Sequence, residues 1–188
     1  MVSGLKLFDL NGKTALITGS SQGIGYALAR GLANAGSDII LNGRNIEKLK
    51  KSAELLNTKQ KIFQLCFDVT DYNQTKQCIN KFEKENKPID ILINNAGMQF
   101  RTPLEDFPPE KFELLLKTNV SSVFNVSKAV VRHMIKRGEG KIINIASVQT
   151  SLARPGIAPY TATKGAVGNI TKGMATDWAK YGIQCNAI

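Results

Sequence analysis

One segment near the start of the chain, residues 14–35, restricts the possible folds more than any other feature. It begins with Thr14-Ala15-Leu16-Ile17-Thr18, an apolar and β-branched run that is typical of a buried strand. Glycines at positions 19, 23 and 25 follow at once, and a helical pattern starts directly after them. Glycine permits a tight turn, a close approach of the backbone to a pyrophosphate, and close packing of helix on strand. The segment therefore predicts a strand, a turn and a helix whose N-terminus faces phosphate groups, with a glycine-rich turn that binds nothing as the alternative.

The helix expected after this turn has a regular apolar pattern. Five residues are spaced to lie on one helix face, and we expect that face to pack on a sheet; they are Ile24, Ala27, Leu28, Leu32 and Ala35. Gly36 stands where a C-terminal glycine ends a helix.

The same alternation of short apolar runs and helical patterns continues through the chain. Further strands are expected at 38–41, 62–67, 89–93, 141–145 and 183–188. Helices are expected after the capping residues Asn45 and Asp71, from near Asn119 to Arg137, and from Pro159-Tyr160 to just before Gly182. This alternation predicts an α/β fold: a doubly wound parallel sheet of the Rossmann type with helices on both faces. Ligands of such sheets bind at the carboxyl ends of the strands.

Composition narrows the class of protein. A chain of 188 residues with 43% hydrophobic residues is expected to form a single domain, 1–188. The net charge of +10 suits an anionic ligand, although lysines on solvated helices explain it equally well. The basic residues form no block of like charges, which argues against a nucleic-acid-binding tail. No apolar run is long enough to span a membrane. The three cysteines have no disulfide or zinc spacing and the single histidine, His133, makes a metal site improbable, so we expect a cytoplasmic protein without a metal.

The glycine turn and the end of the second strand indicate which nucleotide binds. The candidate phosphate-binding residues are Gly19, Ser21, Gln22, Gly23, Ile24 and Gly25. The second strand ends in Leu41-Asn42-Gly43-Arg44, without the acid that would bind a ribose 2′-hydroxyl. The Arg44 guanidinium is instead suited to a 2′-phosphate, which favours NADP over NAD. Alternatively, Arg44 is only a surface residue at the start of a helix.

The Gly-x-x-x-Gly-x-Gly spacing resembles the short-chain dehydrogenase/reductase family, and other motifs along the chain from Leu10 onward agree with it. Asn94-Asn95-Ala96-Gly97 follows the fourth strand, and Asp68-Val69 follows the third. The resemblance implies that Asn95, Ala96 and Gly97 line the cofactor site and that Asp68 and Val69 lie beside the adenine ring. Asn119, Ser147, Tyr160 and Lys164 match the catalytic tetrad of the family in order and in the Tyr-x-x-x-Lys spacing.

The expected chemistry is hydride transfer coupled to proton transfer at an alcohol oxygen. A free tyrosine hydroxyl loses its proton only near pH 10. Lys164, one turn after Tyr160 on the same helix face, and the positive nicotinamide ring would favour the phenolate. Ser147 would hydrogen-bond the substrate oxygen, and the resemblance implies that Asn119 holds a water linking Lys164 to solvent.

Within the family, the local sequences around residues 94–108, 132–134 and 147–160 most resemble members that interconvert gluconate and 5-keto-gluconate. Arg101 and Arg154 would hold a sugar-acid carboxylate, and Gln149 would bond a sugar hydroxyl. Alternatively, both arginines are residues of the pocket rim or of a subunit interface. A 3-oxoacyl-carrier-protein reductase and a nucleotide-binding protein without turnover also stay open.

Chains of this family are usually longer, and this one ends inside its sixth predicted strand. We therefore expect a domain truncated at its C-terminus, without the last strand of the sheet and the substrate loop that the resemblance implies. The long helices near 119–137 and 160–181 resemble those with which the family forms homodimers and homotetramers.

Overall fold

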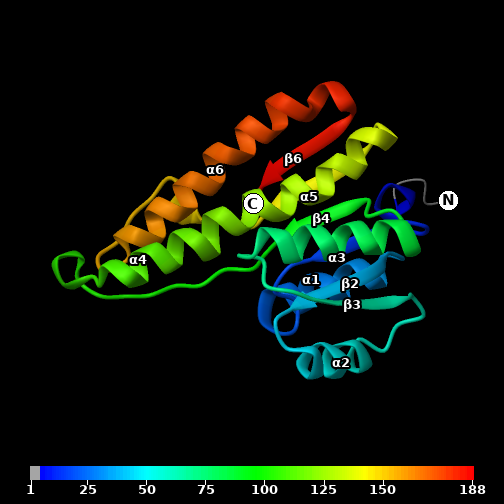
Figure 1. Ribbon diagram of the computed structural model, residues 1–188, viewed down its shortest axis with the longest axis horizontal. Coiled ribbons are helices and arrows are strands. Elements are labelled where there is room, and N and C mark those ends of the chain that lie inside the picture. The colour runs from blue at the N-terminus through cyan, green and yellow to red at the C-terminus, as the bar shows by residue number, and fades with distance from the viewer. Residues whose placement is uncertain (1–4) are drawn as a thin grey trace.

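A computed structural model of the chain describes residues 5–188, which contain a parallel sheet in the strand order β3-β2-β1-β4-β5-β6 (Figure 1). The strands are β1 (Thr14–Ile17), β2 (Asp38–Gly43), β3 (Ile62–Cys66), β4 (Ile91–Asn94), β5 (Gly140–Asn144) and β6 (Ile183–Ala187). Every neighbouring pair is parallel. From β1 the chain adds β2 and β3 on one side of the sheet and then β4, β5 and β6 on the other side. The boundary between β1 and β4 is therefore the switch point of a doubly wound sheet. The predicted fold class is confirmed.

Helices lie on both faces of this sheet. They are α1 (Gly23–Asn34), α2 (Ile46–Leu55), α3 (Tyr72–Glu85), α4 (Pro109–Leu116), α5 (Ser122–Arg137) and α6 (Ala158–Trp178). Short helical turns are η1 (Leu5–Phe8), η2 (Leu104–Asp106), η4 (Val148–Thr150) and η5 (Ala179–Tyr181), and η3 (Lys117–Ser121) is a π-helical turn. The helices α1 and α2 cover one face, whereas α3, α5 and α6 cover the other. None of the helices within residues 5–188 is long and apolar enough to cross a membrane.

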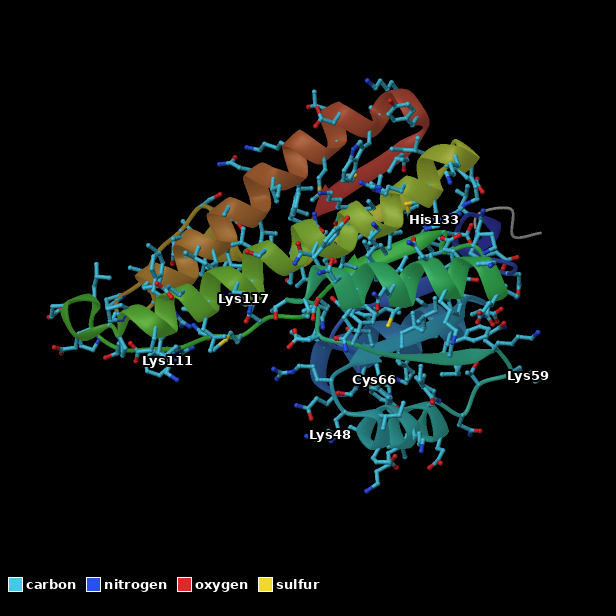
Figure 2. The ribbon with its side chains drawn as sticks, in the orientation of Figure 1. Lys48, Lys59, Cys66, Lys111, Lys117 and His133 are labelled. Carbon is cyan, nitrogen blue, oxygen red and sulfur yellow. The ribbon has the colours of Figure 1, made fainter. Side chains whose placement is uncertain are left out.

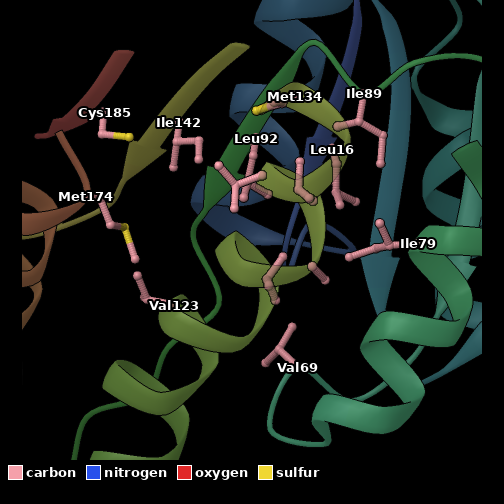
Figure 3. Close-up of a cluster of buried hydrophobic side chains, with 14 of the residues drawn as sticks. Leu16, Val69, Ile79, Ile89, Leu92, Val123, Met134, Ile142, Met174 and Cys185 are labelled. Carbon is pink, nitrogen blue, oxygen red and sulfur yellow. The ribbon is translucent and has the colours of Figure 1, made fainter. Parts of the chain in front are cut away.

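The strands are apolar at successive positions because both of their faces are covered. Leu16, Leu92 and Ile142 point toward α3, α5 and α6 and pack with Ile79 and Met134 (Figure 3). The neighbouring positions on the strands point to α1 and α2, where Ile17, Ile39, Leu41 and Ile93 form a second core. Two apolar layers therefore hold the sheet rigid behind the carboxyl ends of its strands.

The predicted packing face of α1 is wrong in part. The buried residues of α1 are Gly25, Ala29 and Ala33, whereas Ile24 is 67% exposed and Ala27 is also exposed. Small residues let the helix backbone lie against the strands, so the buried side of α1 follows residue size as well as hydrophobicity. Ile24 is thereby free to line the surface in front of the strand ends.

The predicted capping residues are confirmed, but one helix begins earlier than expected. Asn45 Oδ1 accepts the N–H of Lys48 and Asp71 Oδ1 accepts the N–H of Gln74, at 2.9 and 3.0 Å. The helix predicted from near residue 119 starts at Pro109 instead and runs through α4, η3 and α5 without a break (Figure 1). The π-helical turn, where Asn119 lies, is inside this long helix.

The positive charge is distributed over separate elements. Figure 2 shows Lys48 and Lys59 near α2, and Lys111 and Lys117 along the α4–α5 helix.

Residues 5–188 contain no group of three or more side chains placed to ligate a metal ion.

Candidate active site

A groove of about 680 Å³ lies at the carboxyl ends of β1, β2 and β4, in front of the switch point. The residues that line it come from five separate segments of the chain. They are Gly19, Ser21–Ile24, Asn42–Arg44, Phe67–Thr70, Asn95–Met98, Leu114 and Thr118. All of the predicted cofactor-binding residues in the glycine turn, except Gly25, are among them, together with Arg44, Asp68, Val69, Asn95, Ala96 and Gly97.

The glycine turn forms a backbone cradle at one end of this groove. Gly19 and Gly23 have φ values of +62° and +61°, which side chains other than glycine rarely adopt. A Cβ at Gly25 would lie 2.5 Å from Asn95 Nδ2 and 2.6 Å from the Gly19 carbonyl oxygen. Gln22 precedes α1 without a side-chain capping bond, so backbone N–H groups of the first turn remain for a ligand. This cradle fits the pyrophosphate of a dinucleotide.

Thr18 and Asn95 join the two loops that flank the groove. Thr18 Oγ1 accepts the N–H groups of Asn95 and Ala96, at 2.9 and 3.0 Å. Asn95 Nδ2 in turn donates to the carbonyls of Thr18 and Gly19, at 2.9 and 3.2 Å. The sequence pattern predicts Asn95 as a site residue but not the role of Thr18. A hydroxyl residue at the last position of an apolar strand is the signal that pointed to it.

Asn42, also missed from the sequence, holds the glycine turn to the neighbouring strands. Its side chain is buried, and its Oδ1 accepts the Gly19 N–H at 3.3 Å. Its Nδ2 donates to the carbonyls of Leu65 and Phe67, at 3.0 and 3.2 Å. The amide at the end of β2 therefore fixes the positions of the cradle and of the chain leaving β3.

Arg44 and Asp68 form the far end of the groove. The Arg44 side chain is 82% exposed, and its Nη1 lies 4.0 Å from Asp68 Oδ2. Asp68 Oδ1 accepts both the N–H and the hydroxyl of Thr70, each at 2.8 Å. A carboxylate held in place by Thr70 and an exposed guanidinium thus lie side by side, and β2 itself ends without an acid.

The four predicted catalytic residues come from three different elements, and buried hydrogen bonds link two of these elements. Asn119 Oδ1 accepts the Met98 N–H at 2.8 Å, while its Nδ2 donates to the Met98 carbonyl and to Thr163 Oγ1, at 2.9 and 3.1 Å. Thr163 Oγ1 donates to the carbonyl of Tyr160 at 2.7 Å. The side chain of Asn119 is therefore a clamp between the loop after β4 and the first turns of α6.

Lys164 lies one helical turn after Tyr160 and is directed toward it. Its Nζ is 5.7 Å from the centre of the Tyr160 ring and donates to the Ile145 carbonyl at 2.6 Å. Lys164 is buried, and burial lowers the pKa of its ammonium group below the usual value of 10.5. The charge closest to Tyr160 on this helix is thus only slightly hydrated.

Ser147 follows β5 and begins the short turn η4. Its Oγ accepts the N–H of Gln149 at 3.1 Å, so its own proton remains available to a substrate oxygen. Gln149 Oε1 is buried and has no hydrogen-bond partner among the described residues.

Arg101 and Arg154 lie outside the nucleotide groove, on the loops after β4 and β5. Both are exposed. The loops are joined by a backbone hydrogen bond from the Thr102 N–H to the Gly156 carbonyl, at 3.2 Å. The two arginines are thus carried on adjoining loops, each within two residues of this bond.

The sequence profile of the short chain dehydrogenase family matches residues 13–188. Over 97% of this chain and 72% of the relative, 54% of residues are identical to gluconate 5-dehydrogenase of Gluconobacter oxydans. Over the same shares, 43% are identical to 5-keto-D-gluconate 5-reductase of Escherichia coli. A 2-dehydro-3-deoxy-D-gluconate 5-dehydrogenase of Formosa agariphila is 42% identical.

Solved structures agree with these matches. A gluconate 5-dehydrogenase of Burkholderia cenocepacia, in complex with NADP and tartrate, superposes with a TM-score of 0.94 at 53% identity. The superposition covers 97% of this chain and 72% of that protein. A short-chain type dehydrogenase/reductase of Mycobacterium marinum superposes with a TM-score of 0.95 at 34% identity.

Proposed function

Because this chain belongs to the short-chain dehydrogenase family, we propose that it is an NADP(H)-dependent oxidoreductase that interconverts gluconate and 5-keto-gluconate. One observation carries the choice of substrate: the chain is 54% identical, over nearly its whole length, to a gluconate 5-dehydrogenase. Reduction of an acyl-carrier substrate and nucleotide binding without turnover are the alternatives that the assay below distinguishes from this proposal.

NADP would lie in the groove with its pyrophosphate over the cradle of Gly19, Gly23 and Gly25. Arg44 would hold the 2′-phosphate and Asp68 the adenine side, which the exposed guanidinium and the adjacent carboxylate support. When bound, the nicotinamide supplies or accepts the hydride. Arg44→Ala should therefore weaken binding of NADPH more than binding of NADH, as measured by quenching of protein fluorescence. An equal loss for both nucleotides would contradict this role of Arg44.

Tyr160 would move the proton at the reacting oxygen. In reduction its hydroxyl gives a proton to the carbonyl oxygen of the substrate, and in oxidation the phenolate takes that proton back. Lys164 favours the phenolate by its charge, Ser147 donates a hydrogen bond to the reacting oxygen, and Asn119 holds the loop after β4 against α6. Tyr160→Phe should remove at least two orders of magnitude from kcat while NADPH binding stays intact.

Gln149, Arg101 and Arg154 would recognise the sugar acid. The unpartnered Gln149 Oε1 would accept a bond from a sugar hydroxyl, and the arginines would hold the carboxylate. Arg101→Ala and Arg154→Ala should each raise KM for gluconate without changing NADP binding. An unchanged KM in both variants would overturn the proposed carboxylate site.

The decisive assay follows NADPH absorbance with purified protein and a panel of substrates. We expect turnover of 5-keto-gluconate with NADPH and of gluconate with NADP. The panel includes 2-dehydro-3-deoxygluconate, because a relative with that activity is 42% identical, and an acetoacetyl thioester as the acyl-carrier analogue. Preferential reduction of the thioester, or nucleotide binding without any turnover, would overturn the proposal.

We also propose that the protein acts as a cytoplasmic homodimer or homotetramer. Phe112 and Phe124 are 38% and 47% exposed on the long helix formed by α4, η3 and α5, which supports self-association through that helix. The three cysteines are free in the structure, in keeping with a reducing compartment. Light scattering after size-exclusion chromatography tests the subunit number, and a monomer at all concentrations would contradict it.

A further inference from the structure

The turn that carries Ser147 is docked on the same helix that carries Tyr160. This turn, η4, is closed by the Thr150 N–H, which donates to the Ser147 carbonyl at 2.9 Å. Thr150 Oγ1 donates to the carbonyl of Lys164 at 3.3 Å. Ser147 and Thr150 therefore belong to one small rigid unit, and the hydroxyl of Thr150 fastens that unit to α6.

The methyl group of Thr150 is fitted against a glycine of the same helix. A Cβ placed on Gly168 would lie 2.5 Å from Thr150 Cγ2, whereas the next nearest atom, Thr150 Cβ, is 3.9 Å away. The conflict thus comes from one methyl group. A glycine inside a helix is destabilising relative to alanine, so its presence here agrees with the close approach of η4.

These contacts fall on the catalytic stripe of α6. Tyr160, Lys164 and Gly168 follow one another at intervals of four residues, so they lie along one helix face. Thr150 spans the last two of them, with its hydroxyl on Lys164 and its methyl on Gly168. Thr150 therefore packs against α6 directly after the turn that carries Tyr160 and Lys164.

We propose that Thr150 and Gly168 act as a matched pair that positions Ser147 relative to Tyr160 for proton transfer. The inference rests on the proposed function, because it assigns a task to Ser147 and Tyr160. Thr150 is a positioning residue: it contacts the catalytic helix and is absent from the residues that line the nucleotide groove. Enlarging residue 168 should push η4 away from α6, and shrinking residue 150 should let it return.

The experiment is a size-exchange cycle with four proteins: wild type, Gly168→Ala, Thr150→Ser, and the double variant. Gly168→Ala should lower kcat by about 10- to 100-fold, since displacements on the order of 1 Å have effects of that size. Thr150→Ser keeps the hydroxyl and removes the methyl, so it should have little effect alone and should restore kcat in the double variant. The dissociation constant of NADPH should stay the same in all four.

Gly173→Ala is the matched control, because Gly173 lies on the same helix with nothing within 4 Å of its added Cβ. It should leave kcat unchanged. A Gly168→Ala variant with wild-type kcat, or one that Thr150→Ser does not rescue, would overturn the inference even when gluconate turnover by the wild type supports the proposed function.

A second readout does not depend on the substrate. Ser147→Cys is introduced into the same four backgrounds, and the rate of thiol alkylation by iodoacetamide is measured. Gly168→Ala should change this rate and Thr150→Ser should return it to the original value. Equal rates in all backgrounds would refute the matched pair whichever substrate the enzyme uses.

Discussion

Replacing Thr18 by valine tests whether one hydroxyl holds the two loops of the nucleotide groove together. Thr18 is 1% exposed, and its Oγ1 accepts the N–H groups of Asn95 and Ala96. Valine has the same shape and cannot accept either bond. An unsatisfied buried donor costs about 1–3 kcal/mol, and both N–H groups belong to half-buried residues, so we expect a loss of about 2–4 kcal/mol.

The assay is urea unfolding at constant pH, with Thr18→Ser as the matched control. Serine keeps the hydroxyl and loses one methyl group, which should cost only about 1 kcal/mol. Thr18→Val should also weaken NADPH binding, because Ala96 lines the groove. If the valine variant were as stable as the serine variant, the hydroxyl would not be holding these loops and the reasoning would fail.

Three further measurements test the roles of the buried charged groups of Asp38, Glu83 and Lys164. Burial alone would raise the pKa of Asp38, but hydrogen bonds from the Lys87 ammonium and the Lys61 N–H lower this pKa overall. The ionised carboxylate therefore contributes its full stabilisation above the unfolded pKa of 3.8, and this contribution is lost as the pH falls through the lower, folded-state pKa. Lys87→Met should therefore cost about 1 kcal/mol at pH 7, and the difference from wild type should shrink in acid unfolding experiments. Removing the partner of the buried carboxylate of Glu83 with Arg137→Met should cost about 3 kcal/mol in urea unfolding, and a neutral result would contradict the ion pair. Since burial lowers the pKa of Lys164, turnover should decline on the alkaline side below the pH expected for an exposed lysine, and Lys164→Arg should move that limit upward in a pH–rate profile.

Much of the candidate site can be predicted from the sequence because the residues concerned are close to one another along the chain. The spacing of glycines 19, 23 and 25 directly after an apolar strand indicates a phosphate cradle, whatever the rest of the chain does. The interval between Tyr160 and Lys164 is one helical turn, so their proximity follows from helix geometry alone. The caps Asn45 and Asp71 likewise act on amide groups three residues away.

The predictions failed or were silent where the deciding neighbour is far away in sequence. On α1 the prediction is wrong for Ile24 and Ala27, which are exposed, whereas Leu28 and Leu32 do pack on the sheet. The most buried positions are Gly25, Ala29 and Ala33, because small residues let the helix lie close to the strands. The helix start at Pro109 is a different case, because it is local: the pattern near Asn119 does not indicate that the helix continues backward through a π-helical turn.

The alternation of strands and helices, the phosphate turn and the order of the predicted catalytic residues can all be predicted from the amino-acid pattern alone. These properties depend on backbone periodicity and on residues within one or two turns of each other. The contacts that hold the site are visible only in the folded protein: Thr18 bonds the loop at residues 95–96, and Thr150 packs on Gly168. These contacts form only after the strand order and register of the sheet have brought the loops and helix α6 next to one another.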